Sequence, residues 1–526
     1  MGIYVNPNSR VLLADMQQDI YVDKSKIITE LNKVFGTSTM SRICVSRPRR
    51  FGKTMVGNLI STYYSKGADS RAIFEKLKIA ETENWDERLN KCNVLKIDLN
   101  DFWNDAESAS DVIPNLTKYV MAEMKEEFPG MITIEETIPK AILAVYKKTG
   151  VPFVVIIDEY DVMVRERVPE SAFESYLKLM SALFKGAGCM EAIGLAYITG
   201  IIPIVKDKVG SKLNNFKEYS MLMPRDFAPY IGFTLSETKE LCERFNIDYD
   251  ECLRWYDGYK ITPEVSICNS NSVCEAISTR TFANYWNRTG AYAAISDFVK
   301  MDFDGIKEDI ATMIGGGSVP VKVGTFSNTL SDLGDKDRVF TYLCHLGYLV
   351  YDDKTKTCSI PNGEIRDEWD NAISDMKDMS PVIEMIRNSE RLLKATLAHD
   401  EQAVATALDK AHKHVTSALT YNNEGALQSA VGLAYFSATS QYTIHRELAA
   451  GDGFADIAFV PYVKGMPGII MELKMDKSPD AALTQIKSRD YASVFNGYSG
   501  PVYLVGVTYG KRTAKHKCKI EVVEKD

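Results

Sequence analysis

One segment near residue 50 places a glycine–lysine–threonine turn between a predicted strand and a predicted helix. This order constrains the fold more than any other feature of the chain. Residues 42–46 form a short apolar run, and residues 54–66 have a helical period of apolar side chains. Gly52, Lys53 and Thr54 match the end of the pattern Gly-x4-Gly-Lys-[Ser/Thr], although Arg47 stands where the first glycine is expected. Such a turn faces an anion with backbone N–H groups and a helix N-terminus, so the segment predicts a phosphate-binding loop.

The residue types in this loop suit a nucleotide and its divalent cation. We expect Lys53 to reach the β- and γ-phosphates and the Thr54 hydroxyl to bind Mg²⁺. The predicted nucleotide-binding residues of the loop also include Arg49, Arg50, Phe51 and Gly52. The arginines at 47, 49 and 50 leave four interpretations open: contact with nucleotide phosphate, with a neighbouring subunit, with nucleic acid, or merely with solvent.

A later apolar run, at residues 153–157, leads into Asp158 and Glu159. A buried strand that ends in two acids predicts that Asp158 binds the Mg²⁺ of the nucleotide and that Glu159 orients or deprotonates water. The alternative is that Asp158 caps the next helix. Thr199, at the end of another apolar run, suits a sensor of the γ-phosphate, and it equally suits the start of a turn. The two half-motifs together favour binding of ATP or GTP.

The order of predicted elements indicates an α/β multidomain protein. Apolar strands, expected at residues 42–46, 94–99, 153–157 and 193–199, alternate with helices in the first part of the chain. This order predicts a P-loop NTPase domain with a parallel sheet covered on both faces. The central part is mainly helical. The last part has the order helix, three strands, helix and strand, with the second helix predicted at residues 479–495, which indicates a mixed α/β unit. The predicted domains are residues 1–231, 232–389 and 390–526.

Composition excludes several classes of protein. The chain has 526 residues, 45% of them hydrophobic and 25% charged, as in ordinary globular proteins. A net charge of −9 argues against nonspecific wrapping of nucleic acid, although a local basic channel is compatible with it. The ten cysteines include no Cys-x-x-Cys pair, so neither a disulfide framework nor a zinc site is predicted. We find no membrane-length apolar run and no signal peptide, and we therefore expect a cytoplasmic protein with no membrane partner.

Near the C-terminus, Asp456 and the group Glu472-Leu-Lys474 lie in two apolar runs. Alternate residues of a strand point to the same face, so Glu472 and Lys474 emerge side by side. If the neighbouring strand brings Asp456 alongside, two carboxylates can hold Mg²⁺ next to a cation, which suits hydrolysis of phosphodiesters. The alternative is a cross-strand salt bridge on an exposed face. The apolar flanks favour buried strands, where unpaired acids would be costly without a cation.

With these residues in hand, the chain resembles a bacterial family of AAA-ATPase-like proteins that carry a C-terminal PD-(D/E)XK nuclease-like domain. The resemblance is close to full length. It is carried by the motifs at residues 21–24, 47–54, 157–161, 198–201, 213–215, 255–259, 285–290 and 347–349, by Asp456 with residues 472–474, and by Gln485 with Lys487 and Tyr491. Arg47 in place of the first loop glycine is similar to the family pattern. The segment at residues 268–272 departs from it, which concerns the middle domain and not the chemistry.

The resemblance implies a restriction-endonuclease-like fold for the last domain and roles for particular residues. Asp456, Glu472 and Lys474 correspond to the two acids and the lysine of the PD-(D/E)XK pattern. Glu424 resembles an additional helix acid, Glu447 is a second candidate metal contact, and Gln485 is a candidate to contact phosphate or to orient a ligand. The lysines of residues 511–519 can grip phosphates or protect an edge strand, and we favour the edge strand.

The predicted function is therefore binding, and we expect hydrolysis, of ATP with Mg²⁺, joined to Mg²⁺-dependent cutting of nucleic acid, of DNA in preference to RNA. A homo-oligomer or a protein partner is compatible with the sequence. The alternative is a non-catalytic protein that is switched by ATP and binds nucleic acid or protein through a degenerate nuclease fold. An ATP-driven motor is the weaker third interpretation, because the sequence contains no clear helicase motif.

Overall fold

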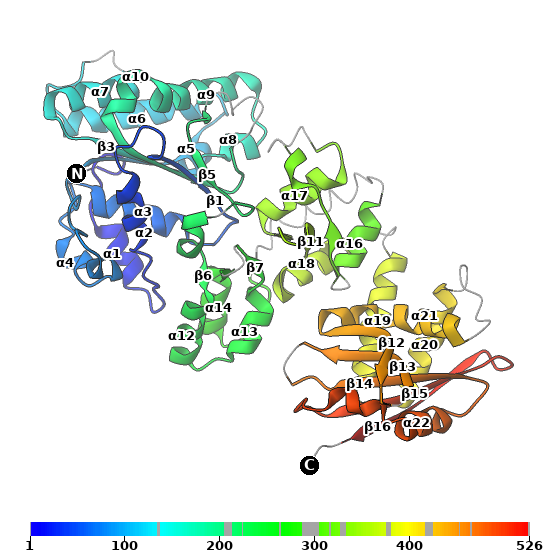
Figure 1. The fold of residues 1–526 in the computed structure, drawn as a ribbon. Helices are drawn as coiled ribbons and strands as arrows, with labels where there is room; N and C mark the ends of the chain where they lie inside the picture. The colour runs from blue at the N-terminus through cyan, green and yellow to red at the C-terminus, as the bar shows by residue number, and fades with distance from the viewer. Residues whose placement is uncertain are drawn as a thin grey trace. The chain divides into compact units, whose positions relative to one another are not determined.

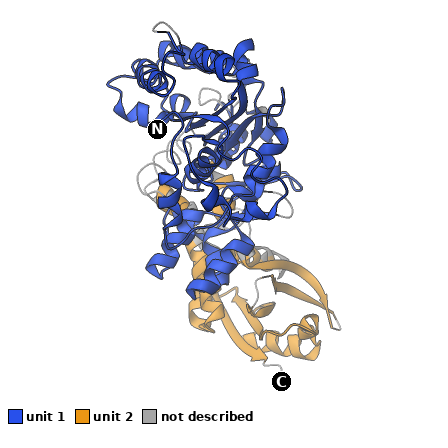
Figure 2. Cartoon of the chain, turned by 90° about the vertical axis from the view of Figure 1, so that its left-hand side faces the viewer, with its two compact units in different colours: residues 1–288, 320–367 blue, residues 289–319, 368–526 orange. Residues whose placement is uncertain are grey.

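The computed structural model describes residues 2–133, 137–204, 213–223, 225–261, 265–286, 305–314, 317–326, 333–374, 380–415, 424–451, 453–462 and 465–523. The chain forms two compact units, residues 1–288 with 320–367 and residues 289–319 with 368–526 (Figure 2). The predicted middle domain is shared between these units. Its boundaries at 231/232 and 389/390 do not coincide with their borders, and the three-domain division stays a prediction.

The first unit contains the predicted parallel sheet. Its five strands have the order β2-β3-β4-β1-β5, and every described pairing among them is parallel. The strands are β1 (Arg42–Ser46), β2 (Asn93–Asp98), β3 (Phe153–Asp158), β4 (Ile193–Gly200) and β5 (Lys217–Tyr219). Every residue of β1, β3 and β4 is buried, as in a sheet covered on both faces. Because β4 lies between β1 and β3, the loop after β1 and the acids after β3 flank the end of β4.

Helices cover both faces of this sheet (Figure 1). One face packs against a core formed with α5 (Leu99–Asp105), α6 (Val112–Glu127), α7 (Ile138–Thr149), α9 (Glu170–Lys185) and α10 (Ala187–Ala192). The other face contacts α3 (Lys53–Tyr64) through β2 and β3. Shorter helices of this part are α1 (Arg10–Met16), α2 (Ile27–Val34), α4 (Arg71–Phe74) and α8 (Val162–Arg165), with the 3-10 helices η1 (Lys78–Glu81) and η2 (Arg225–Tyr230).

The central part of the chain has helices around two small three-stranded sheets, with orders β6-β8-β7 and β10-β11-β9. Its helices are α12 (Leu235–Phe245), α13 (Tyr249–Tyr256), α14 (Ser270–Thr279), α16 (Ile306–Ile314), α17 (Lys336–Leu346) and α18 (Gly363–Ser374), with η3 (Val323–Thr325). Its strands are β6 (Phe233–Thr234), β7 (Tyr259–Lys260), β8 (Ser266–Cys268), β9 (Val319–Pro320), β10 (Val350–Asp352) and β11 (Thr357–Ser359). The prediction of a mainly helical region is confirmed.

The C-terminal part is a mixed sheet of order β12-β13-β14-β15-β16, in which only β14 and β15 pair in parallel. The strands are β12 (Tyr442–Ala450), β13 (Gly453–Pro461), β14 (Gly468–Met475), β15 (Val502–Gly510) and β16 (Lys515–Val523). One face packs against a core formed with α19 (Ser380–Leu397), α20 (Glu401–Val415) and α21 (Glu424–Ala434), and the other face packs against α22 (Pro479–Ser488). A further 3-10 helix, η6 (Phe436–Ser440), precedes β12.

The predicted helix at residues 479–495 is interrupted. Helix α22 ends at Ser488, and a 3-10 helix, η7 (Tyr491–Phe495), follows it. Between them Asp490 has a left-handed backbone with φ of +48°, which an α-helix does not accommodate. Across the described parts of the chain, no helix combines the length and the apolar character needed to span a bilayer.

Candidate functional site

The loop after β1 curls around the ammonium group of Lys53. Gly52 has φ of +86°, a left-handed conformation suited to glycine, and α3 begins at the next residue. The Lys53 side chain is only 5% exposed, and its Nζ donates hydrogen bonds to the carbonyl oxygens of Arg47 (3.1 Å) and Pro48 (3.0 Å). Burial lowers the pKa of Lys53, against the effect of Glu159 and Asp158. The predicted cation therefore lies inside the loop, at the start of a helix.

The loop arginines differ in their surroundings. Arg47 is buried, and its Nη1 donates to the carbonyls of Ser46 (2.9 Å) and Tyr219 (3.1 Å), which ties the base of the loop to β5. Burial lowers the pKa of Arg47 to about 10. Arg49 and Arg50 are exposed, and Nη1 of Arg50 donates to the carbonyl of Tyr285 at 3.2 Å. Arg47 therefore bonds the loop to β5. Sequence reasoning did not predict this structural role for Arg47.

Thr54 and Asp158 meet at the carboxyl ends of the parallel strands. The Thr54 hydroxyl donates to Oδ2 of Asp158 at 2.6 Å, and Oδ1 of Asp158 accepts the N–H of Glu159 at 3.0 Å. Asp158 is 2% exposed, and burial raises its pKa while the bond from Thr54 lowers it. The N-cap of α8 is Asp161, so Asp158 does not cap the following helix. A hydroxyl and a carboxylate side by side are oxygen ligands of the kind that Mg²⁺ takes, and they fit the predicted ion.

Glu159 lies between two cations. Its Oε1 is 3.8 Å from Nζ of Lys53, and its Oε2 is 2.5 Å from Nη2 of Arg165. Sequence reasoning did not identify Arg165. The only signal for it was an arginine on the helix that follows the two acids.

Two further side chains border these acids. Thr199 is buried in β4, and its Oγ1 has no hydrogen-bond partner among the described residues. Asp98 ends β2 in register with Asp158, and burial together with the charge of Asp158 raises the pKa of Asp98 to about 6. Asp98 was missed as a site residue, although its position at the end of a predicted strand was a signal. The structure therefore groups four residues at the carboxyl ends of the strands: Thr54, Asp98, Asp158 and Thr199.

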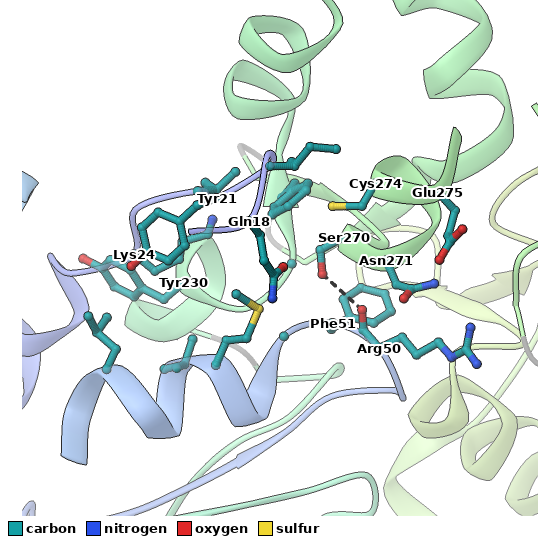
Figure 3. Close-up of a pocket in the computed structure, with 18 residues that line it drawn as sticks. Gln18, Tyr21, Lys24, Arg50, Phe51, Tyr230, Ser270, Asn271, Cys274 and Glu275 are labelled. Atoms are coloured by element: carbon teal, nitrogen blue, oxygen red, sulfur yellow. Dashed lines mark hydrogen bonds between the residues drawn. The ribbon is translucent and has the colours of Figure 1, made fainter. Parts of the chain in front are cut away.

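A pocket of about 390 Å³ lies next to Gly52 (Figure 3). Its wall is formed by the segment after α1, by the loop and start of α3, and by α14. Figure 3 shows the Gln18 amide and the rings of Tyr21 and Tyr230 on one side, and Phe51 and Ser270 on the other. The pocket thus combines aromatic faces with a few polar groups, as small-molecule sites do.

Hydrogen bonds fix two walls of this pocket. Nζ of Lys24, in the predicted motif at residues 21–24, donates to the carbonyl of Pro229 (2.8 Å) and pairs with Oε2 of Glu237 (2.5 Å). The Ser270 hydroxyl donates to the carbonyl of Arg50 at 3.1 Å. The start of α14 is therefore bonded directly to the phosphate-binding loop.

The C-terminal sheet brings Asp456, Glu472 and Lys474 together. The described pairing of β13 with β14 ends at Ile457 with Met471, and beyond it Oδ2 of Asp456 accepts the N–H of Leu473 at 2.7 Å. Nζ of Lys474 donates to Oε1 of Glu472 at 2.7 Å. The Asp456 carboxylate therefore bonds to the main chain between Glu472 and Lys474, and the side chains of these two residues pair with each other.

Glu472 is suited to bind a cation. The residue is 1% exposed, and its Oε2 has no hydrogen-bond partner in the described parts of the chain. Burial raises the pKa of Glu472, and the charge of Asp456 adds to this effect. A buried carboxylate oxygen without a partner fits a divalent ion. Within the described ranges no group of three or more His, Cys, Asp or Glu side chains has the spacing of a metal site.

The accessory candidates differ in position. Glu424 begins α21, and its side chain lies outside the described residues. One turn later, Nε2 of Gln428 donates to the carbonyl of Asp456 at 2.5 Å, a contact that sequence reasoning missed. Glu447 is exposed, with φ of +52°, and the pairs on either side of it place it opposite Asp456. Nε2 of Gln485 donates to the Tyr491 hydroxyl at 3.4 Å.

Of the lysines in residues 511–519, Lys515, Lys517 and Lys519 lie on β16, the last strand of the sheet, and Lys511 lies in the turn before it. Lys515 pairs with Asp409 at 3.1 Å, and Lys519 pairs with Asp480 of α22. This arrangement matches the interpretation of an edge strand that carries charge.

Comparison with known proteins assigns families to two parts of the chain. Residues 14–210 match the family model described as "Predicted AAA-ATPase", and residues 422–518 match the model of the PD-(D/E)XK nuclease superfamily. None of the curated proteins compared with the chain matches it significantly.

Solved structures give weaker likenesses. The Aeropyrum pernix ORC1 protein in complex with DNA is 13% identical, with 72% of this chain and 98% of that chain covered and a TM-score of 0.28. The Aeropyrum pernix ORC2 protein is 11% identical, with 69% and 98% covered and a TM-score of 0.33. Drosophila ORC bound to DNA is 11% identical, with 69% and 91% covered and a TM-score of 0.25. TM-scores this low carry no functional argument.

Proposed function

Because the chain joins an AAA-ATPase-like domain to a C-terminal PD-(D/E)XK nuclease-superfamily domain, we propose that it hydrolyses ATP and cuts nucleic acid in a Mg²⁺-dependent reaction. Two contacts support the proposal: the Thr54 hydroxyl bonds to Asp158, and the Lys474 ammonium bonds to Glu472.

In the first unit, the γ- and β-phosphates would lie at Lys53, and Thr54 and Asp158 would hold Mg²⁺. Glu159 would accept a proton from the attacking water, since its Oε1 is turned toward Lys53. The pocket beside Gly52 would take the base, because aromatic faces lie next to the loop there.

In the C-terminal domain, Asp456 and Glu472 would hold Mg²⁺, which supplies a Lewis acid for the phosphate oxygen and for water. The ammonium of Lys474 would stabilise the negative charge that develops on the phosphate. We propose DNA as the substrate in preference to RNA.

A turnover assay tests this function. Purified full-length protein is incubated with ATP and plasmid, with Mg²⁺ or Mn²⁺ or with EDTA, and phosphate release and nicking are measured. We expect both activities with metal and neither with EDTA. Binding of ATP and DNA without phosphate release or nicking would instead support a non-catalytic, ATP-switched binding protein.

A further inference from the structure

The Glu159 carboxylate is held in one orientation at the end of β3. Its Oε2 is 2.5 Å from Nη2 of Arg165, and its Oε1 is 3.8 Å from Nζ of Lys53. The Glu159 backbone has φ of +50°, a conformation that residues other than glycine seldom adopt. Surrounding contacts must therefore stabilise this backbone conformation. One carboxylate oxygen is therefore occupied by the arginine, while the other faces the lysine of the phosphate-binding loop.

Arg165 is itself anchored. Its side chain is 10% exposed, and its Nε is 3.3 Å from Oδ2 of Asp161. The same oxygen of Asp161 accepts the N–H groups of Ile201 (3.0 Å) and Ile202 (2.9 Å), directly after β4. Asp161 and Glu159 raise the pKa of Arg165, in opposition to its burial. A continuous set of polar contacts thus connects Glu159, through Arg165, to the main chain after β4.

We propose that Arg165 is a positioning residue for ATP hydrolysis, which fixes the Glu159 carboxylate with Oε1 directed at the water that attacks the γ-phosphate. The inference rests on the proposed function, in which Glu159 accepts the proton of that water. In this step the water oxygen bonds to the γ-phosphorus, the bond from that phosphorus to the bridging oxygen of ADP breaks, and the water proton passes to Oε1.

The argument for positioning is geometric. A glutamate side chain without a second partner samples several rotamers, and only some of them place an oxygen near the γ-phosphate. An arginine that binds one carboxylate oxygen also restricts the position of the other oxygen. Loss of a residue that orients a reacting group typically lowers activity about 10- to 100-fold. Arg165 acts through Glu159 and not on the phosphate.

The test is steady-state ATP turnover by the full-length protein. Arg165→Gln is expected to lower kcat about 10- to 100-fold, while KM for ATP and the ATP-dependent rise in melting temperature stay within about two-fold of wild type. Arg165→Lys keeps the charge but loses the planar fork, so it should recover part of the rate. Arg167→Gln is the matched control, because Arg167 is an exposed arginine two residues further on. Its turnover should equal that of wild type.

The Glu159→Gln background separates positioning from a general effect on folding. If Arg165 acts only through Glu159, adding Arg165→Gln to Glu159→Gln leaves the residual single-turnover rate unchanged. The inference is overturned if Arg165→Gln has the wild-type kcat. It is also overturned if Arg165→Gln lowers the rate in the Glu159→Gln background by the same factor as in wild type. Should melting curves show that Arg165→Gln does not fold, wild-type kcat in Arg165→Lys overturns it in the same way. Steady-state turnover at the wild-type rate in Glu159→Gln or in Lys53→Ala refutes the proposed ATPase site itself, a separate result.

Discussion

The hydroxyl of Thr54 donates a 2.6 Å hydrogen bond to Oδ2 of Asp158, across 104 positions of sequence. Thr54 belongs to the first turn of α3, and Asp158 ends β3, which is separated from β1 by β4. The bond therefore requires the order β3-β4-β1 of the parallel sheet. Two half-motifs that are each weak in sequence become one site because the sheet brings the ends of these strands together.

Replacement of Lys53 by alanine should abolish nucleotide binding. Lys53 is a buried cation at the end of the loop, and without it the bound phosphates would lose their main charge partner. Wild type at an ATP concentration of about 100 times Kd should gain about 2.7 kcal/mol of stability, and Lys53→Ala should gain none. Thermal melting with and without Mg²⁺–ATP measures this. Lys76→Ala, at an exposed lysine of the same unit, is the control, and an ATP-dependent shift retained by Lys53→Ala would contradict the site.

Replacement of Lys474 by alanine should stop cutting and spare ATP binding. The ammonium is buried against Glu472, where it can stabilise charge on a phosphate in a medium of low dielectric. We expect a loss of about 10²- to 10³-fold in plasmid nicking with Mg²⁺, a magnitude typical of one electrostatic group. Lys477→Ala, at an exposed lysine just after β14, should cut as wild type does. Equal nicking by the two variants would assign the activity elsewhere.

The stability of the nucleotide-free protein should depend on pH through Asp98. Burial and the adjacent Asp158 raise the pKa of Asp98 from 3.8 to about 6. Because this pKa is raised, the ionised carboxylate is disfavoured in the folded state, and stability falls as pH rises from about 4 to about 6. Asp98→Asn removes the charge but keeps a side-chain oxygen that can accept from the N–H of Asn100 at the start of α5.

Melting of metal-free protein checks this prediction. At pH 7.5 Asp98→Asn should melt at a higher temperature than wild type, with a gain on the order of 1–2 kcal/mol after screening by solvent. The gain should shrink as the pH falls from 6 toward 4, because the wild-type carboxyl is then protonated in the fold. Equal melting temperatures at pH 7.5 would show that the carboxylate is not destabilising.

Much of the fold was predictable because its signals are local. The apolar strands, the turn at Gly52, and the acids after β3 and on β13 and β14 are all visible in short stretches of sequence. The interruption after Ser488 was not predicted, because apolar residues continue the helical period while Asp490 adopts a left-handed backbone. Periodicity reports which face is buried and not where a helix breaks.

The partners of the site residues were less accessible to sequence reasoning. The contacts of Asp98 and Gln428 exist only after separate segments pack, whereas Arg165 lies within six residues of both Glu159 and Asp161. Each of the three belongs to a common residue type in an ordinary helix or strand. Glu447 shows the reverse: the pairs on either side of it place it opposite Asp456, yet its backbone is left-handed and the residue is exposed. Register alone did not determine which acids approach one another.

Replacement of Gly506 by alanine should destabilise the C-terminal unit alone. Gly506 pairs with Glu472, and a Cβ at Gly506 would lie 2.5 Å from the carbonyl oxygen of Pro479, so α22 must move away from the sheet. Overpacking of this kind costs about 1–3 kcal/mol. Melting curves should show an earlier transition of the C-terminal unit, while the transition of the first unit keeps its full ATP-dependent shift, since the proposed ATP site lies in the first unit. Gly324→Ala is the control, because an added Cβ there meets nothing within 4 Å. An unchanged melting curve for Gly506→Ala would mean that α22 does not pack against β15 as closely as this contact requires.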